Sequence, residues 1–148
     1  MNKTSHPARY FALLIAVPLA LVISGCSVLD EAAHKMRSVS FDTSAEVTDE
    51  WKGTAAWLPS DATDIEIRES TVNDTAVILA TSDATLDPAL CTVVPRQSAP
   101  AYQLDGAPSA YDATEALACG AWTVTATEDG WLGWTPNHPD EAKKSPTP

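Results

Sequence analysis

The segment 121–135 places the strongest constraint on the fold of this 148-residue chain. Residues 121–127 alternate between two kinds of side chain, as a β-strand with two different faces does. Asp129-Gly130 is a favoured two-residue hairpin turn, because glycine accepts the positive φ that such a turn requires. Residues 131–135 then form the returning strand, so the fold must be built on a sheet that contains this hairpin.

The predicted turn also assigns side chains to the two faces of the hairpin. It places Thr125 opposite Trp134. Trp131 then lies on the same face as Trp122, whereas Leu132 lies with Trp134 on the other face. Since both faces carry aromatic rings, we expect the hairpin either to be covered on both sides or to present one aromatic face.

A second hairpin is predicted near residues 64–81. Residues 64–68 alternate apolar and charged side chains, which is typical of a strand with one wet face. Residues 75–81 contain an apolar run and predict a more buried strand. Asn73-Asp74 supplies turn residues between the two strands.

Weaker patterns surround the two hairpins. Residues 86–90 favour a helical turn, and residues 112–117 favour a short helix with Asp112 as its N-cap or else run into the next strand. Hairpins combined with such turns predict a small α+β domain on an antiparallel sheet, with an all-β domain as the alternative.

The amino terminus has the pattern of an export signal. Residues 1–10 carry Lys3 and Arg9 and no acidic residue, and residues 11–24 form an uncharged, mostly apolar stretch. A membrane-spanning helix needs about 20 apolar residues, so this stretch is short for a span. The alternative is a retained single-pass anchor.

The residues that follow sharpen this prediction. Ile23-Ser24-Gly25-Cys26 resembles the lipobox of bacterial lipoproteins. The resemblance implies cleavage before Cys26, attachment of a diacylglyceryl group to its sulfur, and a place on the extracytoplasmic face of the cell membrane. Two acyl chains hold a protein stably at a bilayer, whereas one does so only marginally. The alternative is that Cys26 belongs to an ordinary secretory cleavage site.

Lipid on Cys26 leaves Cys91 and Cys119, the other two of three cysteines. Outside the cytoplasm such a pair is expected to form a disulfide. The bridge would close a loop of 29 residues, counting both ends, and the chain-entropy model assigns such a loop about 3.5 kcal/mol of stability. The alternative is two buried free thiols.

The composition divides the chain into four parts. Residues 38–50 are rich in Ser, Thr, Asp and Glu, which favours a loose segment. Val39, Phe41 and Val47 are exceptions that would instead let the segment dock as an edge strand. We expect a signal peptide over 1–25, the lipidated cysteine and a flexible tether over 26–50, a globular domain over 51–140 that holds all five tryptophans, and a disordered tail over 141–148.

The chain is strongly acidic. Its formal net charge is −11, and removal of Lys3 and Arg9 with the signal brings it to −13. Such a protein is repelled by nucleic acids and by anionic lipid headgroups. We therefore exclude nucleic-acid binding and expect the lipid, not the charge, to hold the protein at the membrane; a cationic partner remains an option.

Catalytic patterns are not evident in the sequence. It contains no nucleophile elbow, phosphate-binding loop or dinucleotide-binding glycine pattern. His34 and His138 lack metal-ligand spacing to another His or Cys. We expect no catalytic residue, no metal and no cofactor.

One acidic cluster offers an alternative. Carboxylates close together can bind cations or hydrolyse glycosides. Alternation of Glu66 with apolar neighbours is equally explained by a solvated strand face. The alternative to a binding protein is thus a small carboxylate-dependent hydrolase using Asp61 and Asp64, and the full cluster is Asp61, Asp64, Glu66 and Glu69.

Trp122-Thr123-Val124, followed by residues 130–134 (Gly-Trp-Leu-Gly-Trp), resembles part of a bacterial SH3-like domain. Many such domains bind cell-wall peptide, so the resemblance implies that Trp131 and Trp134 contact a ligand. The alternative is that these tryptophans form the core, with Gly133 letting a ring pack across it.

Together these features predict a membrane-anchored extracytoplasmic lipoprotein. We expect its domain to be non-catalytic and to bind a protein or cell-wall partner. The alternatives are an accessory structural subunit of an envelope complex and the small hydrolase.

Overall fold

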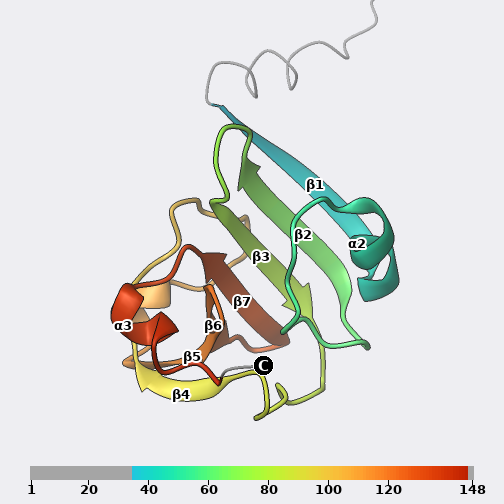
Figure 1. The fold of residues 1–148 in the computed structure, drawn as a ribbon. Helices are drawn as coiled ribbons and strands as arrows, with labels where there is room; N and C mark the ends of the chain where they lie inside the picture. Colours follow the sequence, from blue (N-terminus) through green and yellow to red (C-terminus); the bar gives the residue numbers. More distant parts are fainter. Residues whose placement is uncertain (1–34, 147–148) are drawn as a thin grey trace, which may run out of the picture.

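The protein folds around one antiparallel sheet. The computed structural model describes residues 35–146, which contain seven strands in the order β1-β2-β3-β7-β6-β5-β4 (Figure 1). The strands are β1 (Met36–Thr43), β2 (Thr63–Ser70), β3 (Ala76–Thr81), β4 (Thr92–Pro95), β5 (Glu115–Cys119), β6 (Trp122–Ala126) and β7 (Gly130–Thr135). Helical structure is limited in this part of the chain to α2 (Ser44–Glu50), α3 (Pro139–Ala142) and a 3₁₀ turn (Ala110–Asp112).

This architecture corrects the predicted fold class. The domain is mostly β, which is closer to the all-β alternative than to α+β. Residues 86–90 form a turn closed by Asp87, whose carbonyl accepts hydrogen bonds from the N–H groups of Leu90 and Cys91. Residues 112–117 run from the 3₁₀ turn into β5. The first segment is thus the single helical turn that its sequence predicted, and the second follows the alternative of running into the next strand, where pairing with β4 outweighs a helix this short.

The predicted hairpin near 64–81 is confirmed. β2 and β3 pair antiparallel, with Ile67 opposite Ile78. The side-chain oxygen of Asn73 accepts a hydrogen bond from the N–H of Thr75, and the N–H of Ser70 donates to the carbonyl of Thr75. The turn residues identified in the sequence therefore close this hairpin as expected.

The hairpin near 121–135 is also present, but its register differs by two residues from the prediction. Thr125 lies opposite Leu132, not opposite Trp134. The N–H of Thr127 donates to the carbonyl of Gly130, so Glu128 and Asp129 form the turn. A shift of two residues leaves each side chain on its predicted face.

Gly130 is required for a different reason than the sequence suggested. It pairs with Thr81 at the start of β7. A Cβ at Gly130 would lie 2.1 Å from the carbonyl oxygen of Ala80 and 2.7 Å from the nitrogen of Ser82. Glycine therefore allows the close approach of β7 to β3 instead of forming the tip of the turn.

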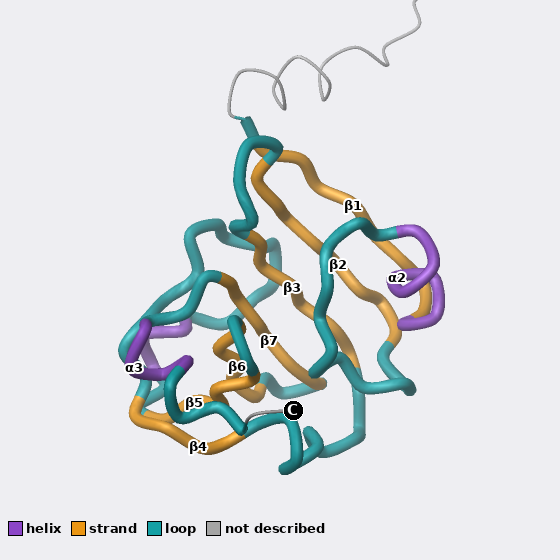
Figure 2. The backbone as a smooth tube through the Cα atoms, in the orientation of Figure 1, coloured by secondary structure: helices purple, strands orange, loops and turns teal. Residues whose placement is uncertain are grey.

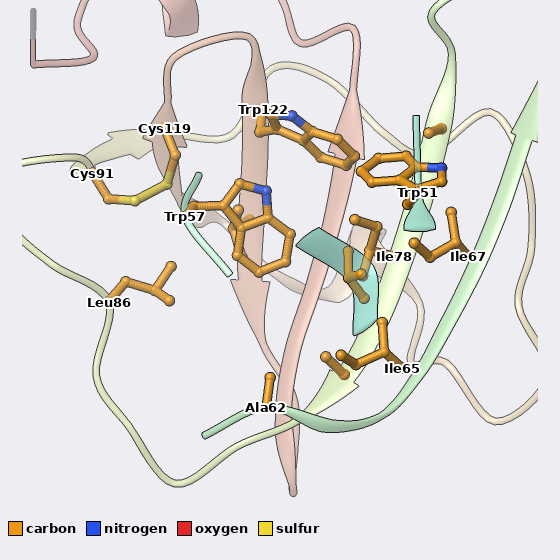
Figure 3. Packing of buried hydrophobic residues seen from close by; sticks show 14 residues of the cluster. Trp51, Trp57, Ala62, Ile65, Ile67, Ile78, Leu86, Cys91, Cys119 and Trp122 are labelled. Atoms are coloured by element: carbon orange, nitrogen blue, oxygen red, sulfur yellow. A yellow bond between two sulfur atoms is a disulfide. The ribbon is translucent and has the colours of Figure 1, made fainter. Parts of the chain in front are cut away.

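One row of residues crosses the whole sheet on the face that carries Trp122, which we call the first face. At its centre lies Gly133, where an added Cβ would be 2.3 Å from the ring of Trp57. Trp57 packs against Trp122, as Figure 3 shows. Their ring centroids lie 5.8 Å apart. The expectation that Gly133 lets a ring pack across it is confirmed. The row consists of Val39, Ile67, Ile78, Gly133, Val124, Leu117 and Val93.

The second face of the sheet is covered by the connection 96–114. This connection is loop apart from its 3₁₀ turn (Figure 2). Its Leu104 and Ala110 are buried against Leu132 and Trp134 of β7. The 121–135 hairpin is therefore covered on both sides.

The predicted tether is shorter than the sequence indicated. Met36–Thr43 is an edge strand and Ser44–Glu50 is a helix, so the docked alternative holds for this segment. We call the hydrophobic cluster on the first face, which contains Trp57 and Trp122, the first core. Val39 and Phe41 pack against it, and Val47 is buried in it. Burial of these apolar side chains outweighs the polar composition around them.

We expect Gly133→Ala to lower the free energy of unfolding by about 1–3 kcal/mol, because the added methyl group overlaps the Trp57 ring in a packed core. Urea denaturation measures this loss. In a Trp57→Phe background the overlapping ring atoms are absent, so the same substitution should cost clearly less. An equal cost in both backgrounds would show that the ring does not depend on this glycine.

Candidate functional site

The tryptophans proposed to bind a ligand are mostly internal. Trp134 is 1% exposed, and its indole N–H donates to the hydroxyl of Ser98 at 2.9 Å. Trp131 is half-buried against the first core, and its indole N–H donates to the carbonyl of Ala84 at 3.0 Å. The structure thus assigns Trp134 to the core, and the hairpin does not expose both indole rings to a ligand.

The acidic cluster does not form one site. Asp61 accepts a hydrogen bond from the hydroxyl of Ser82 at 2.7 Å, near one end of β2. Glu69, near the other end of β2, is paired with Arg37 of β1. Within residues 35–146, no group of three or more His, Cys, Asp or Glu side chains is arranged to hold a metal ion.

Cys91 and Cys119 form a disulfide with an S–S distance of 2.06 Å. The bridge lies next to the pairing of Thr92 with Ala118, so it extends the ladder between β4 and β5 by one position. It thereby ties the start of the edge strand β4 to the sheet. Its role here is structural.

A groove lies between α2 and the segment that follows it. The groove has a volume of about 640 Å³. Asp49 is the one ionisable residue in its lining. The groove can therefore bind a ligand through shape and apolar contacts, but it lacks a pair of groups for acid–base chemistry. Its lining is Ser44, Ala45, Val47, Thr48, Asp49, Trp51, Gly53, Thr54, Ala55, Ala56, Leu58 and Ser60.

The sequence prediction missed this groove because it treated α2 as part of the tether. A signal was present in Thr43-Ser44-Ala45-Glu46, which has the spacing of a capping box. In the structure, the side chain of Thr43 accepts from the N–H of Glu46, and the carboxylate of Glu46 accepts from the N–H of Asp42.

A second pocket, of about 500 Å³, lies on the other side of the segment 51–54. Lys52, Glu69 and Asp74 contribute charged groups to its lining. The carboxylate of Glu69 is already engaged, because it accepts from the indole N–H of Trp51 at 3.0 Å and pairs with Arg37. This contact fixes the start of the segment 51–54 against β1 and β2.

A separate polar cluster centres on Glu141, whose side chain is fully buried. One carboxylate oxygen accepts from the backbone N–H groups of Gln97 at 2.6 Å and Ser98 at 3.2 Å. The other accepts from the hydroxyls of Ser98 and Thr123 and from the N–H of His138. Glu141 therefore joins α3 to the start of the long connection and to β6.

Burial raises the pKa of Glu141, but the hydrogen bonds from Ser98, Gln97, His138 and Thr123 together lower it below its ordinary value. The side chain has no exposed surface, and protein donors occupy both oxygens. The carboxylate is therefore placed to hold the fold and not to reach a substrate.

The structure corrects the prediction of a disordered tail over 141–148 for the described residues 141–146. Residues 139–142 form α3, and His138 is its N-cap. The pattern His138-Pro139-Asp140-Glu141 carried the signal, because Pro is favoured at the first helical position and Glu at the third.

Cys26 and the lipobox lie outside the described residues, as does His34. In residues 35–146 there is no helix with the length and apolar character needed to cross a membrane. Comparison with known proteins found no matching family model, curated protein or solved structure.

We expect Glu141→Gln to lower the free energy of unfolding at pH 7 by about 2–3 kcal/mol. The side-chain amide of glutamine would place N–H donors opposite the protein donors that the carboxylate accepts from, so these donors would lose their acceptor. Since folding lowers the pKa of Glu141, the ionised carboxylate stabilises the fold above pH 4.5 and loses this effect as the pH falls below that value.

The difference in the free energy of unfolding between the wild type and Glu141→Gln should therefore decrease below pH 4.5. Denaturation curves from pH 7 to pH 3 measure it. Asp140→Asn, at the exposed neighbouring carboxylate, is the control and should cost much less. A gap that stayed constant with pH would contradict the assignment of the charge to Glu141.

Proposed function

We propose that this protein is an extracytoplasmic lipoprotein, held at the cell membrane by lipid on Cys26, whose non-catalytic domain binds a protein or cell-wall partner in the α2 groove. The anchor rests on the export signal and the lipobox. The binding role rests on the groove itself, whose lining is largely apolar and carries Asp49 as its one ionisable group.

The geometry supports binding more than hydrolysis. Two catalytic carboxylates would have to face each other across a concave site. Asp61 and Asp64 line neither the α2 groove nor the 500 Å³ pocket, and the hydroxyl of Ser82 already donates to Asp61. The charge supports a partner with basic groups near the groove, because the protein is strongly acidic and Asp49 lies in the lining.

Thr48→Arg tests this proposal. Thr48 is exposed on α2 and lines the groove, so a long cationic side chain there should block it. We expect crosslinking in intact cells, followed by purification of the protein, to yield a partner complex with the wild type that is strongly reduced by this substitution.

Thr114→Arg is the matched control. It makes the same chemical change at an exposed residue just before β5, five strands away from β1 in the sheet order. The control should retain the complex. Retention of the complex by both variants would rule out the groove as the binding site.

A further inference from the structure

The chain enters the fold at one end of the sheet. The first strand begins at Met36, and the carbonyl of Lys35 accepts a hydrogen bond from the N–H of Thr71 at 2.8 Å. The entry point therefore lies beside the turn that joins β2 to β3, as Figure 1 shows. We call this the entry end of the sheet.

The distance from the proposed anchor to the entry end is limited by chain length. Ten residue steps separate Cys26 from Met36. Such a segment spans at most about 35 Å when fully extended, and a flexible one has a root-mean-square span of about 17 Å. The predicted tether of 24 residues would have reached considerably further, so an anchor on Cys26 would hold the entry end closer to the membrane than that tether does.

The entry end carries an exposed apolar side chain and basic residues. Val72, in the β2–β3 turn, is 65% exposed. Lys35 and Arg37 lie where β1 begins, and Lys52 lines the 500 Å³ pocket together with Asp74 of the same turn. Acidic groups are also present here: Asp74 lies in the turn, and Glu69 pairs with Arg37, so these two charges offset each other.

The opposite end is uniformly acidic. It is formed by the segments 60–64, 81–84 and 127–130, which meet where Thr81 pairs with Thr63 and with Gly130. These three segments contain no Lys or Arg. Their acidic residues are Asp61, Asp64, Asp83, Glu128 and Asp129.

We propose that the domain lies on the membrane to which it is anchored, with its entry end, and the Val72 turn in particular, against anionic lipid headgroups. The acidic end then points away from this membrane. The inference rests on the proposed lipid anchor. The short tether brings the entry end to the bilayer, and like-charge repulsion keeps the acidic end from it. The α2 groove reaches the acidic end at Ser60, so a partner can approach it from the side away from the bilayer.

Single introduced cysteines test this orientation. With Cys26 lipidated and Cys91 bonded to Cys119, a new cysteine is the one reactive thiol. Val72→Cys and Thr81→Cys place it at exposed, uncharged positions at the entry and acidic ends respectively. Each membrane-extracted variant is labelled with a fluorophore and placed in vesicles of phosphatidylglycerol and phosphatidylethanolamine that carry a headgroup quencher.

We expect quenching at position 72 to be several-fold greater than at position 81, and this ratio to fall in vesicles of phosphatidylcholine alone. Equal quenching at the two positions on acylated protein would overturn the orientation and leave the lipid anchor intact. An unchanged ratio in phosphatidylcholine would overturn the role of charge. Intact mass of the same samples reports the acylation, and its absence would overturn the proposed function as well.

Discussion

The contact between Trp57 and Gly133 is the interaction on which the rest of the structure depends. Gly133 lies on a central strand in a row that crosses every strand of the sheet in residues 35–146. Because it has no side chain, the ring of Trp57 reaches the sheet there and joins Trp122. The chain on both sides of Trp57 is thereby drawn over the first face, which creates the groove beside α2.

The second face depends on a different kind of interaction. The connection 96–114 is long for a loop without regular structure, and such loops need specific anchors. Its apolar anchor is Leu104, and its polar anchor is the buried carboxylate of Glu141. Two layers thus cover one sheet, one held by aromatic packing and one by hydrogen bonds to a buried charge.

The sequence predicted the parts of this arrangement that depend on local patterns. Alternation and turn residues located both hairpins, and the face of each tryptophan followed from parity even though the register was two residues off. What depends on distant contacts was missed. Met36–Thr43 is polar in composition and becomes a strand only because β2 lies beside it, and Glu141 becomes buried only because residues 97 and 98 reach it.

Intact mass of the native, membrane-extracted protein, before and after reduction, tests the central claim most directly. A lipid-anchored protein with the observed disulfide should lack residues 1–25, carry the mass of an acylated glyceryl group on Cys26, and gain two hydrogens on reduction. A full-length mass without acyl addition would contradict the account, because residues 11–24 would then be a retained anchor.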